Sequence, residues 1–302
     1  MTQPAIVAIV GPTASGKSAL AMALAVRVPL EIISADSRQV YRGMDIGTAK
    51  PTAVERAAVP HHFLDVASPD ETFTVARWVA AARALLPEIA ARGHLPLLVG
   101  GTGLYVSALL AGFDFERQAW SPDVRRQLAE ELAAEGIGVL AERLSRLAPG
   151  VAAHTDLRNP RRVLRALERA AAGDLERPRA EPYAGPVTSI GLRLSTETLD
   201  ARIAARAEGM FTAGLLPETQ RLLDAGYGRD LPSMSGHGYR EAAAVLDGAI
   251  SEAQAIRATT LRVRRYARRQ MSWFRRDPRI QWLAADDRRL VDAAMALLPA
   301  TG

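Results

Sequence analysis

The sequence of 302 residues contains no cysteine, two lysines and a single asparagine. Without cysteine the chain forms neither disulfides nor thiolate metal sites, which suits a cytoplasmic protein. No run of about eighteen apolar residues occurs, so we expect no membrane span. The opening segment MTQPAIVAIVGPT lacks the basic leader and the small-residue cleavage site of a signal peptide. With 48% apolar and 24% charged residues, the composition predicts a soluble globular protein.

The cations are almost all arginines, because only Lys17 and Lys50 among 38 basic residues are lysines. We attribute this bias to a GC-rich genome. A lysine kept against such a bias indicates a position that needs a compact ammonium instead of a planar guanidinium. The argument suits Lys17, which lies in a glycine-rich loop, better than Lys50.

The net charge of +5 is concentrated near the C-terminus. Residues 257–279 contain nine arginines and one aspartate, a local charge of +8, so the rest of the chain sums to −3. Tyr266, Trp273 and Phe274 lie among these arginines, a composition typical of single-strand nucleic-acid binding. Tyr266, Gln270 and Trp273 have helical spacing, i, i+4 and i+7. We therefore expect an aromatic face on the core and an arginine face on phosphates.

The start of the chain has the pattern of a phosphate-binding P-loop. Residues 5–11 are an apolar run typical of a buried parallel strand, and residues 18–28 are rich in helix formers. Between them lies GPTASGKS, Gly11 to Ser18. In such a loop, backbone N–H groups and a helix N-terminus hold phosphate, the lysine adds a charge and the serine helps to hold magnesium. Such a loop binds phosphates, so its sequence does not distinguish a protein that binds ATP from one that binds another diphosphate.

Further apolar runs predict an α/β fold with a P-loop NTPase-like parallel sheet flanked by helices. Residues 75–92 have the pattern of an amphipathic helix containing Pro87. The adjacent pair His61-His62 lacks metal-ligand spacing, and we interpret it as a turn or packing pair. The other strands are expected at residues 30–37, 95–105, 189–195 and 279–285.

Between residues 113 and 186 the sequence predicts helices and no strand. One of these helices begins with Asn159 as N-cap and Pro160 at its first position. We therefore expect an all-helical insertion. The predicted domains are the first part of the core, 1–112, the insertion, 113–186, and the second part of the core, 187–302.

Asp36 follows the second predicted strand, at the carboxyl edge of the sheet, where ligands bind in open α/β folds. Position alone makes a general base, a magnesium ligand and a helix cap near-equal interpretations.

Six segments occur in a distinctive order: GPTASGKS, DSRQVYRGMDIGTAKP, LLVGGTGLYVSALL, NPRRVLRALE, GYRE and RRQMSWFRR. In this order they resemble the bacterial type of the tRNA dimethylallyltransferase family, also called isopentenyl-tRNA transferases. The resemblance extends from about residue 5 to residue 285, and DS-x-Q-x-Y followed by DIGTAKP is its most specific part. One departure is His237 in MSGHGYRE, where many members have a more apolar run.

The resemblance implies transfer of a dimethylallyl group from its diphosphate to the exocyclic 6-amino group of the adenosine 3′ of a tRNA anticodon, with Mg²⁺ as cofactor. It implies that Asp36 is the base, that Lys17 stabilises the leaving diphosphate and that Thr102 helps to bind the adenosine. The glycines beside Thr102 would let backbone approach the ligand, or would form a plain strand-end turn. Arg206 would contact the diphosphate or lie on a solvated helix face.

The binding residues that the P-loop pattern and the resemblance imply fall into two sets. The diphosphate site comprises Gly11, Pro12, Thr13, Ala14, Ser15, Gly16, Lys17, Ser18 and Arg206, with Ser18 near the metal. The tRNA site comprises Asp36, Ser37, Arg38, Gln39, Thr102, Arg125, Pro160, Arg161, Arg162, Val163, Leu164, Ser235, Gly236, His237, Gly238, Tyr239, Arg240, Arg268, Arg269, Gln270, Met271, Ser272, Trp273, Phe274 and Arg275. The expected partners of a monomeric protein are the tRNA anticodon stem-loop and dimethylallyl diphosphate, without a membrane.

Three other functions stay open and are ranked behind this one. A P-loop small-molecule kinase would explain residues 5–28 and nothing after them. An adenylate isopentenyltransferase would need neither the helical insertion nor the basic segment. A non-catalytic tRNA-binding protein would not need a phosphate loop beside Asp36.

Overall fold

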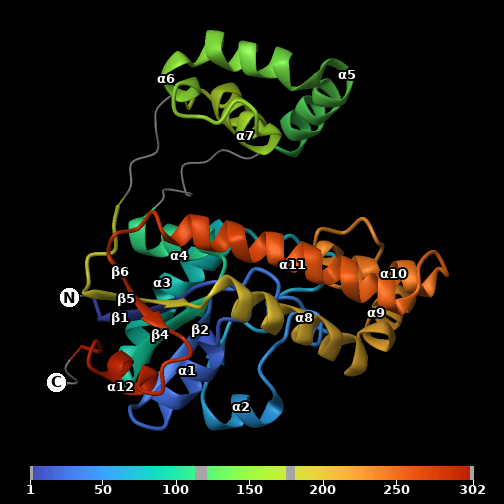
Figure 1. Cartoon of the computed structure of the whole chain (residues 1–302). Coiled ribbons are helices and arrows are strands. Elements are labelled where there is room, and N and C mark those ends of the chain that lie inside the picture. Colours follow the sequence, from blue (N-terminus) through green and yellow to red (C-terminus); the bar gives the residue numbers. More distant parts are fainter. Residues whose placement is uncertain (1–2, 113–120, 175–180, 300–302) are drawn as a thin grey trace. The chain divides into compact units, whose positions relative to one another are not determined.

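The computed structural model describes residues 3–112, 121–174 and 181–299 (Figure 1). The chain divides into two compact units. One consists of Met1–Leu110 with Tyr183–Gly302, and the other of Ala111–Pro182. The first unit contains the sheet, and the described residues of the second are helical or irregular.

A six-stranded sheet with the order β3-β2-β4-β1-β5-β6 forms the centre of the first unit. Every strand pair is parallel. All residues of β1 and β2 are buried, as expected of parallel strands covered on both faces. The predicted α/β class and its five predicted strands are therefore confirmed. The strands are β1 (Ile6–Val10), β2 (Leu30–Ser34), β3 (His61–His62), β4 (Leu95–Gly100), β5 (Val187–Arg193) and β6 (Ile280–Ala284).

Strand β3, which the sequence analysis does not predict, contradicts the interpretation of His61-His62 as a turn, whereas the packing interpretation agrees with the structure. The two histidines pair with Ile32 and Ile33 of β2. The side chain of His62 does pack inward, with Nε2 at 2.6 Å from Oε2 of the buried Glu31. A strand of two residues has no periodicity, so the sequence gives no alternation from which to predict it.

Helices flank the sheet (Figure 1). On one face, α1 and α12 pack on the side chains of Val7 and Ile9 in β1, together with neighbouring strand residues. The long helix α3 contains Pro87, as predicted. The helices of this unit are α1 (Lys17–Ala25), α2 (Ala53–Ala58), α3 (Val75–Ala91), α4 (Gly103–Ala111), α8 (Thr196–Thr212), α9 (Leu215–Asp224), α10 (Tyr239–Leu246), α11 (Glu252–Phe274) and α12 (Leu290–Met295), with a 3₁₀ turn, η1, at Ser233–Ser235.

The second unit contains α5 (Pro122–Leu147), α6 (Pro149–Ala152) and α7 (Pro160–Ala171). Gly136 has non-helical dihedrals, φ 80° and ψ 172°, and divides α5 into two helical parts. Asn159 caps α7, because its side chain accepts hydrogen bonds from the N–H groups of Arg161 and Arg162. The apolar faces of these helices form a separate core that includes Leu140, Leu144, Val163 and Leu167.

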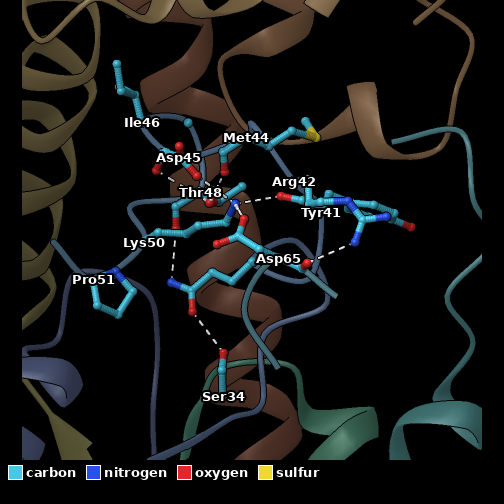
Figure 2. Close-up of polar contacts among 12 residues, drawn as sticks. Ser34, Tyr41, Arg42, Met44, Asp45, Ile46, Thr48, Lys50, Pro51 and Asp65 are labelled. Carbon is cyan, nitrogen blue, oxygen red and sulfur yellow. Dashed lines mark hydrogen bonds and ion pairs between the residues drawn. The ribbon is translucent and has the colours of Figure 1, made fainter. Parts of the chain in front are cut away.

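The contacts of the Lys50 ammonium, shown in Figure 2, explain why a lysine occupies position 50. Its side chain is only 1% exposed, and Nζ lies 2.6 Å from the carbonyl oxygen of Tyr41, 2.7 Å from Oδ1 of Asp45 and 2.5 Å from Oδ1 of Asp65. An ammonium has three donors, and these converging oxygens accept one each. Lys50 therefore fixes the backbone conformation of the segment that follows Asp36, from Tyr41 to Lys50.

A buried carboxylate holds the other side of this segment. Glu218 of α9 is 2% exposed and accepts hydrogen bonds from the N–H groups of Asp45, Ile46 and Gly47 at 2.9–3.2 Å. The hydroxyl of Tyr239, at the start of α10, donates to the same carboxylate at 2.6 Å. The carboxylate thus links the segment to both α9 and α10.

We expect Glu218→Ala to lower the free energy of unfolding by at least about 2 kcal/mol, because it leaves several buried donors without an acceptor. Tyr239→Phe is the matched control: it removes one donor, leaves the carboxylate its three N–H partners, and is expected to cost roughly 1–2 kcal/mol. Urea unfolding followed by circular dichroism measures both. Equal losses in the two variants would contradict this role of Glu218.

Candidate functional site

Three loops meet at the carboxyl edge of the sheet. The glycine-rich loop, Gly11–Ser18, follows β1, Asp36 follows β2, and residues 101–103 follow β4. Strands β2, β4 and β1 are adjacent in the sheet. The structure therefore brings the regions of Lys17, Asp36 and Thr102 to one edge, where ligands bind in open α/β folds.

The glycine-rich loop has the strand-loop-helix context that the sequence predicts. Gly16 lies in the left-handed region with φ 94° and precedes the first residue of α1, Lys17. The first turn of α1 leaves N–H groups without partners inside the helix, and these groups favour an anion. In this structure Nζ of Lys17 donates a hydrogen bond to the carbonyl oxygen of Pro12 at 2.7 Å. The ammonium is thereby folded back over its own loop.

Two cations and one carboxylate share this edge. Burial and the Arg206 guanidinium lower the pKa of Lys17, the Asp36 carboxylate raises it, and the net result is a pKa of about 7. Burial also lowers the pKa of Arg206, which Asp36 raises. Arg206 of α8 therefore lies within electrostatic range of both residues, and the solvated-face interpretation does not apply. Two partly buried cations favour an anionic ligand.

Asp36 and Thr102 are held by neighbouring backbone groups. Oδ1 of Asp36 accepts a hydrogen bond from the N–H of Arg38 at 2.8 Å, which fixes the carboxylate. Thr102 donates its N–H to the carbonyl oxygen of Ala35, and its Oγ1 accepts from the N–H of Ser37, both at 3.1 Å. Because residues 35–52 contain no helix, the helix-cap interpretation of Asp36 is wrong. Two of the three predicted roles of Asp36 remain, a general base and a magnesium ligand.

The glycines beside Thr102 make room for protein. A Cβ atom at Gly100 would lie 2.2 Å from the carbonyl oxygen of Ala35, and one at Gly101 would lie 2.1 Å from Nε2 of Gln270. At Gly103 it would lie 2.4 Å from the ring of Trp273. Packing against protein atoms therefore accounts for glycine at these positions, and the approach of backbone to a ligand stays a prediction.

The inward face of α11 contacts two of the three loops. Gln270 accepts a hydrogen bond from the N–H of Thr13 and donates one to the carbonyl oxygen of Gly101, each 2.8 Å long. The hydroxyl of Tyr266 lies close to Thr102. Nε1 of Trp273 donates to Oγ of Ser107 at 3.0 Å. The inward packing expected for the i, i+4, i+7 positions is confirmed for Gln270, which is buried, and for Tyr266, which is half-buried, whereas Trp273 is 37% exposed.

The outward face of α11 carries the arginines. Arg268, Arg269 and Arg275 are exposed, as are Ser272 and part of Trp273. The Arg269 guanidinium lies over the ring of Tyr266, 5.7 Å from its centroid. Met271 is half-buried, whereas the side chain of Phe274 is buried in the core. An exposed arginine row is the surface that a nucleic-acid backbone requires.

We expect replacement of Arg268 and Arg269 by alanine to weaken tRNA binding and to reduce the slope of log Kobs against log[salt] by about 1.4–1.8, because two phosphate contacts would be lost. Arg257→Ala removes an exposed arginine near the start of the same helix and is the matched control, with a smaller change expected. Filter binding at several salt concentrations measures the slope. An unchanged slope in the double variant would show that these arginines do not contact phosphates.

Residues 235–240 border the same edge. The Arg38 guanidinium donates to Oγ of Ser235 at 3.0 Å. The ring of His237 lies 4.8 Å from that of Tyr266, and burial lowers the pKa of His237 to about 4, helped by Arg38 and other arginines. The imidazole is therefore neutral near pH 7. Ser235 and Arg240 are exposed, whereas Gly236, Gly238 and Tyr239 are buried.

Other predicted tRNA residues have internal partners. Gln39 accepts a hydrogen bond from the Ser34 hydroxyl at 2.8 Å and donates to the carbonyl oxygens of Thr48 and Ala49 (Figure 2). Tyr239 and Phe274 are at most 2% exposed. These side chains support the loops and helices around the site.

The predicted residues of the insertion lie in the second unit. Arg125 forms an ion pair with the buried Glu168, Nε to Oε1 at 2.7 Å. Arg161 and Arg162 are exposed on α7, and Val163 is buried in the core of this unit. Their contacts with tRNA stay predictions, as do those of Pro160 and Leu164.

Tyr266 is the main residue of the site that the predicted sets omit. Its ring contacts His237 and Arg269, and its hydroxyl lies close to Thr102. Its spacing with Gln270 is the signal that marks it, because residues four apart share one helix face.

Comparisons with known proteins agree with this arrangement. The IPP transferase family model matches residues 39–277. The chain is 48% identical over 296 residues to a tRNA dimethylallyltransferase of Roseiflexus sp. (strain RS-1), with 97% of each chain covered. It is 39% identical to the solved tRNA isopentenylpyrophosphate transferase from Bacillus halodurans, covering 98% of this chain and 95% of that one, with a TM-score of 0.73. A solved eukaryotic dimethylallyltransferase acting on tRNA is 23% identical, with 97% and 77% covered and a TM-score of 0.77, a likeness of fold.

Within the described residues, no helix combines the length and apolar character needed to cross a membrane.

Proposed function

The chain belongs to the IPP transferase family, and on that premise we propose that it transfers a dimethylallyl group from dimethylallyl diphosphate to the exocyclic 6-amino group of the adenosine 3′-adjacent to the anticodon in tRNA, releasing diphosphate. The observation that carries the proposal is the meeting of the glycine-rich loop, Asp36 and Thr102 at one sheet edge. Helix α11 is hydrogen-bonded to the glycine-rich loop and to Gly101, which precedes Thr102. The exposed arginines of that helix supply a nucleic-acid surface beside the anion site.

The first part of the reaction is loss of the diphosphate. As the allylic C–O bond breaks, its electron pair moves to the diphosphate, and negative charge grows on those oxygens. The transition state is stabilised by fixed positive groups at this position. The N–H groups of the glycine-rich loop and the cations of Lys17 and Arg206 support this role, because they lie together at the carboxyl edge. Nζ of Lys17 donates to the carbonyl oxygen of Pro12, a contact that the diphosphate would replace.

The second part is formation of the C–N bond. The exocyclic amine of adenosine attacks the allylic carbon and must lose one proton. A carboxylate within reach takes that proton, and Asp36 is the candidate. Thr102, hydrogen-bonded to the Ser37 N–H and close to Tyr266, is held beside it and would orient the adenosine.

Magnesium is the proposed cofactor, and the described residues offer it a candidate protein ligand, Ser18. Ser18 is exposed in the first turn of α1, with a hydroxyl oxygen of the hard type that magnesium prefers. In the described part of the chain, no group of three His, Asp or Glu side chains is arranged to hold a metal ion. Magnesium would therefore be held mainly by diphosphate oxygens and water, with Ser18, and would neutralise charge on the leaving group.

The proposed partner is the anticodon stem-loop of tRNA, bound by a monomer in the cytoplasm. The target base must leave the loop stack to reach an enclosed site, and single-stranded loops lower the cost of that step. The exposed arginines of α11 would contact phosphates, and so would Arg161 and Arg162 of the insertion. Analytical ultracentrifugation of the protein alone and with the stem-loop tests the monomer and the complex.

A direct transfer assay tests the activity. The protein is incubated with magnesium, labelled dimethylallyl diphosphate and an unmodified tRNA that carries adenosine 3′ of its anticodon, with adenosine monophosphate in a parallel reaction. We expect label in the tRNA alone. Label in the free nucleotide would indicate an adenylate isopentenyltransferase. No transfer together with ATP-dependent phosphorylation would indicate a kinase, and tRNA binding without any turnover would indicate a binding protein.

A further inference from the structure

The side-chain amide of Gln270 is used at both ends inside the protein. Oε1 accepts a hydrogen bond from the N–H of Thr13 in the glycine-rich loop, and Nε2 donates to the carbonyl oxygen of Gly101, both at 2.8 Å. The residue is 6% exposed. Each end of the amide thus has a partner inside the protein, although the family resemblance places Gln270 among the tRNA-binding residues.

Gln270 connects loops that the proposed reaction uses for different substrates. Thr13 belongs to the loop proposed to hold the diphosphate, and Gly101 precedes Thr102, which is proposed to orient the adenosine. The close approach is built into the sequence, because a Cβ atom at position 101 would lie 2.1 Å from Nε2 of Gln270. A single side chain thus sets the separation of the two loops.

The same helix also carries the arginine face. Arg268 and Arg269 are exposed on α11 and directly precede Gln270 in the sequence. Packing reinforces the connection, because Val263 and Ala267 of α11 pack with Ala14 of the glycine-rich loop. A small displacement of α11 on tRNA binding would move Gln270 and, through it, both loops.

We propose that Gln270 is a positioning residue that couples tRNA binding to prenyl diphosphate binding, an inference that rests on the proposed function. When α11 is held by tRNA, Gln270 fixes the loops at the spacing that the diphosphate and the adenosine both require. Coupling of this kind is reciprocal, so each substrate tightens the binding of the other by the same factor.

The test is a thermodynamic cycle. We measure the Kd of an anticodon stem-loop with and without dimethylallyl thiodiphosphate, an unreactive analogue. For the unchanged protein we expect the analogue to tighten binding roughly fivefold or more, the usual lower range of such coupling. For Gln270→Met, which has a similar length and neither hydrogen bond, we expect a ratio near one, with each ligand alone bound within about threefold of normal.

A second pair of variants separates positioning from simple stabilisation. Gln270→Glu is isosteric, keeps the acceptor for Thr13 and loses the donor to Gly101, so it should also lose the coupling and should decide the matter where Gln270→Met fails to fold. Arg257→Ala is the matched control, because Arg257 is exposed near the start of α11 and lies outside the predicted tRNA set, so the ratio should be unchanged. In steady-state assays, the KM for either substrate should stop depending on the concentration of the other in the Gln270 variants.

Three outcomes would overturn the inference: a ratio of one in the unchanged protein, an unchanged ratio in Gln270→Glu, or a lower melting temperature with the coupling retained. Label transfer to tRNA is measured in the same preparation of the unchanged protein. Label transfer to tRNA without coupling between the two ligands would contradict only the proposed role of Gln270. Absence of label transfer would contradict the proposed function itself.

Discussion

Asp36→Asn is expected to lower kcat by about 10²–10⁴-fold, the usual contribution of a general base, while tRNA binding changes little. Asparagine has the same shape and keeps an oxygen that can accept the Arg38 N–H, so the turn after β2 should persist. It cannot take the proton that the adenosine amine loses. Single-turnover transfer of labelled dimethylallyl groups to saturating tRNA measures this effect.

Asp70→Asn is the matched control for this variant, because Asp70 is an exposed carboxylate and no role in binding or catalysis is proposed for it. Stem-loop affinity and the melting temperature are measured for both variants. A normal single-turnover rate in Asp36→Asn would leave the magnesium-ligand interpretation of Asp36 as the one to pursue, and would remove its role as base.

Lys17→Met is expected to lower kcat by about 10²–10³-fold, as loss of one preorganised electrostatic contact does, and to raise the KM for dimethylallyl diphosphate. The ammonium stabilises charge that grows on the diphosphate, so its loss affects the transition state more than the ground state. Initial rates over a range of diphosphate concentrations separate the two parameters. A raised KM with normal kcat would assign Lys17 to binding alone.

The pH profile gives an independent test of Lys17. Its pKa is lowered to about 7 by burial and by Arg206, so the residue is charged below that pH and loses its proton as the pH rises. The kcat/KM for dimethylallyl diphosphate reports the free enzyme, and it should therefore fall as the pH rises through about 7. Lys17→Arg stays charged throughout this range and should lack that fall.

Much of the core could be predicted from local sequence. The strand before Gly11 and the helix after it are marked by a continuous apolar run and by helix formers. Asp36 is placed by its position after the second strand, since the carboxyl ends of parallel strands share an edge. The family resemblance supplied the proposed roles of Asp36 and Thr102, which position alone leaves open.

The rest depends on partners that are distant in the sequence. Gln270 lies 257 residues from Thr13, and no local pattern shows that they are hydrogen-bonded. For the same reason, the glycines around Thr102 suggested a ligand, although Gln270 and Trp273 of α11 occupy the space. Tyr239 was predicted to contact tRNA, yet its burial follows from packing of α9 and α10, which involves Glu218.

The short edge strand has a consequence for association between chains. A long exposed edge presents unpaired N–H and C=O groups that a neighbouring chain can extend as a new strand. Here the edge beyond β2 is closed by only His61 and His62, and the residue before them, Pro60, has no N–H to donate. This side of the sheet therefore offers another molecule almost no ladder on which to add, and the fold limits edge-to-edge aggregation there through the brevity of β3.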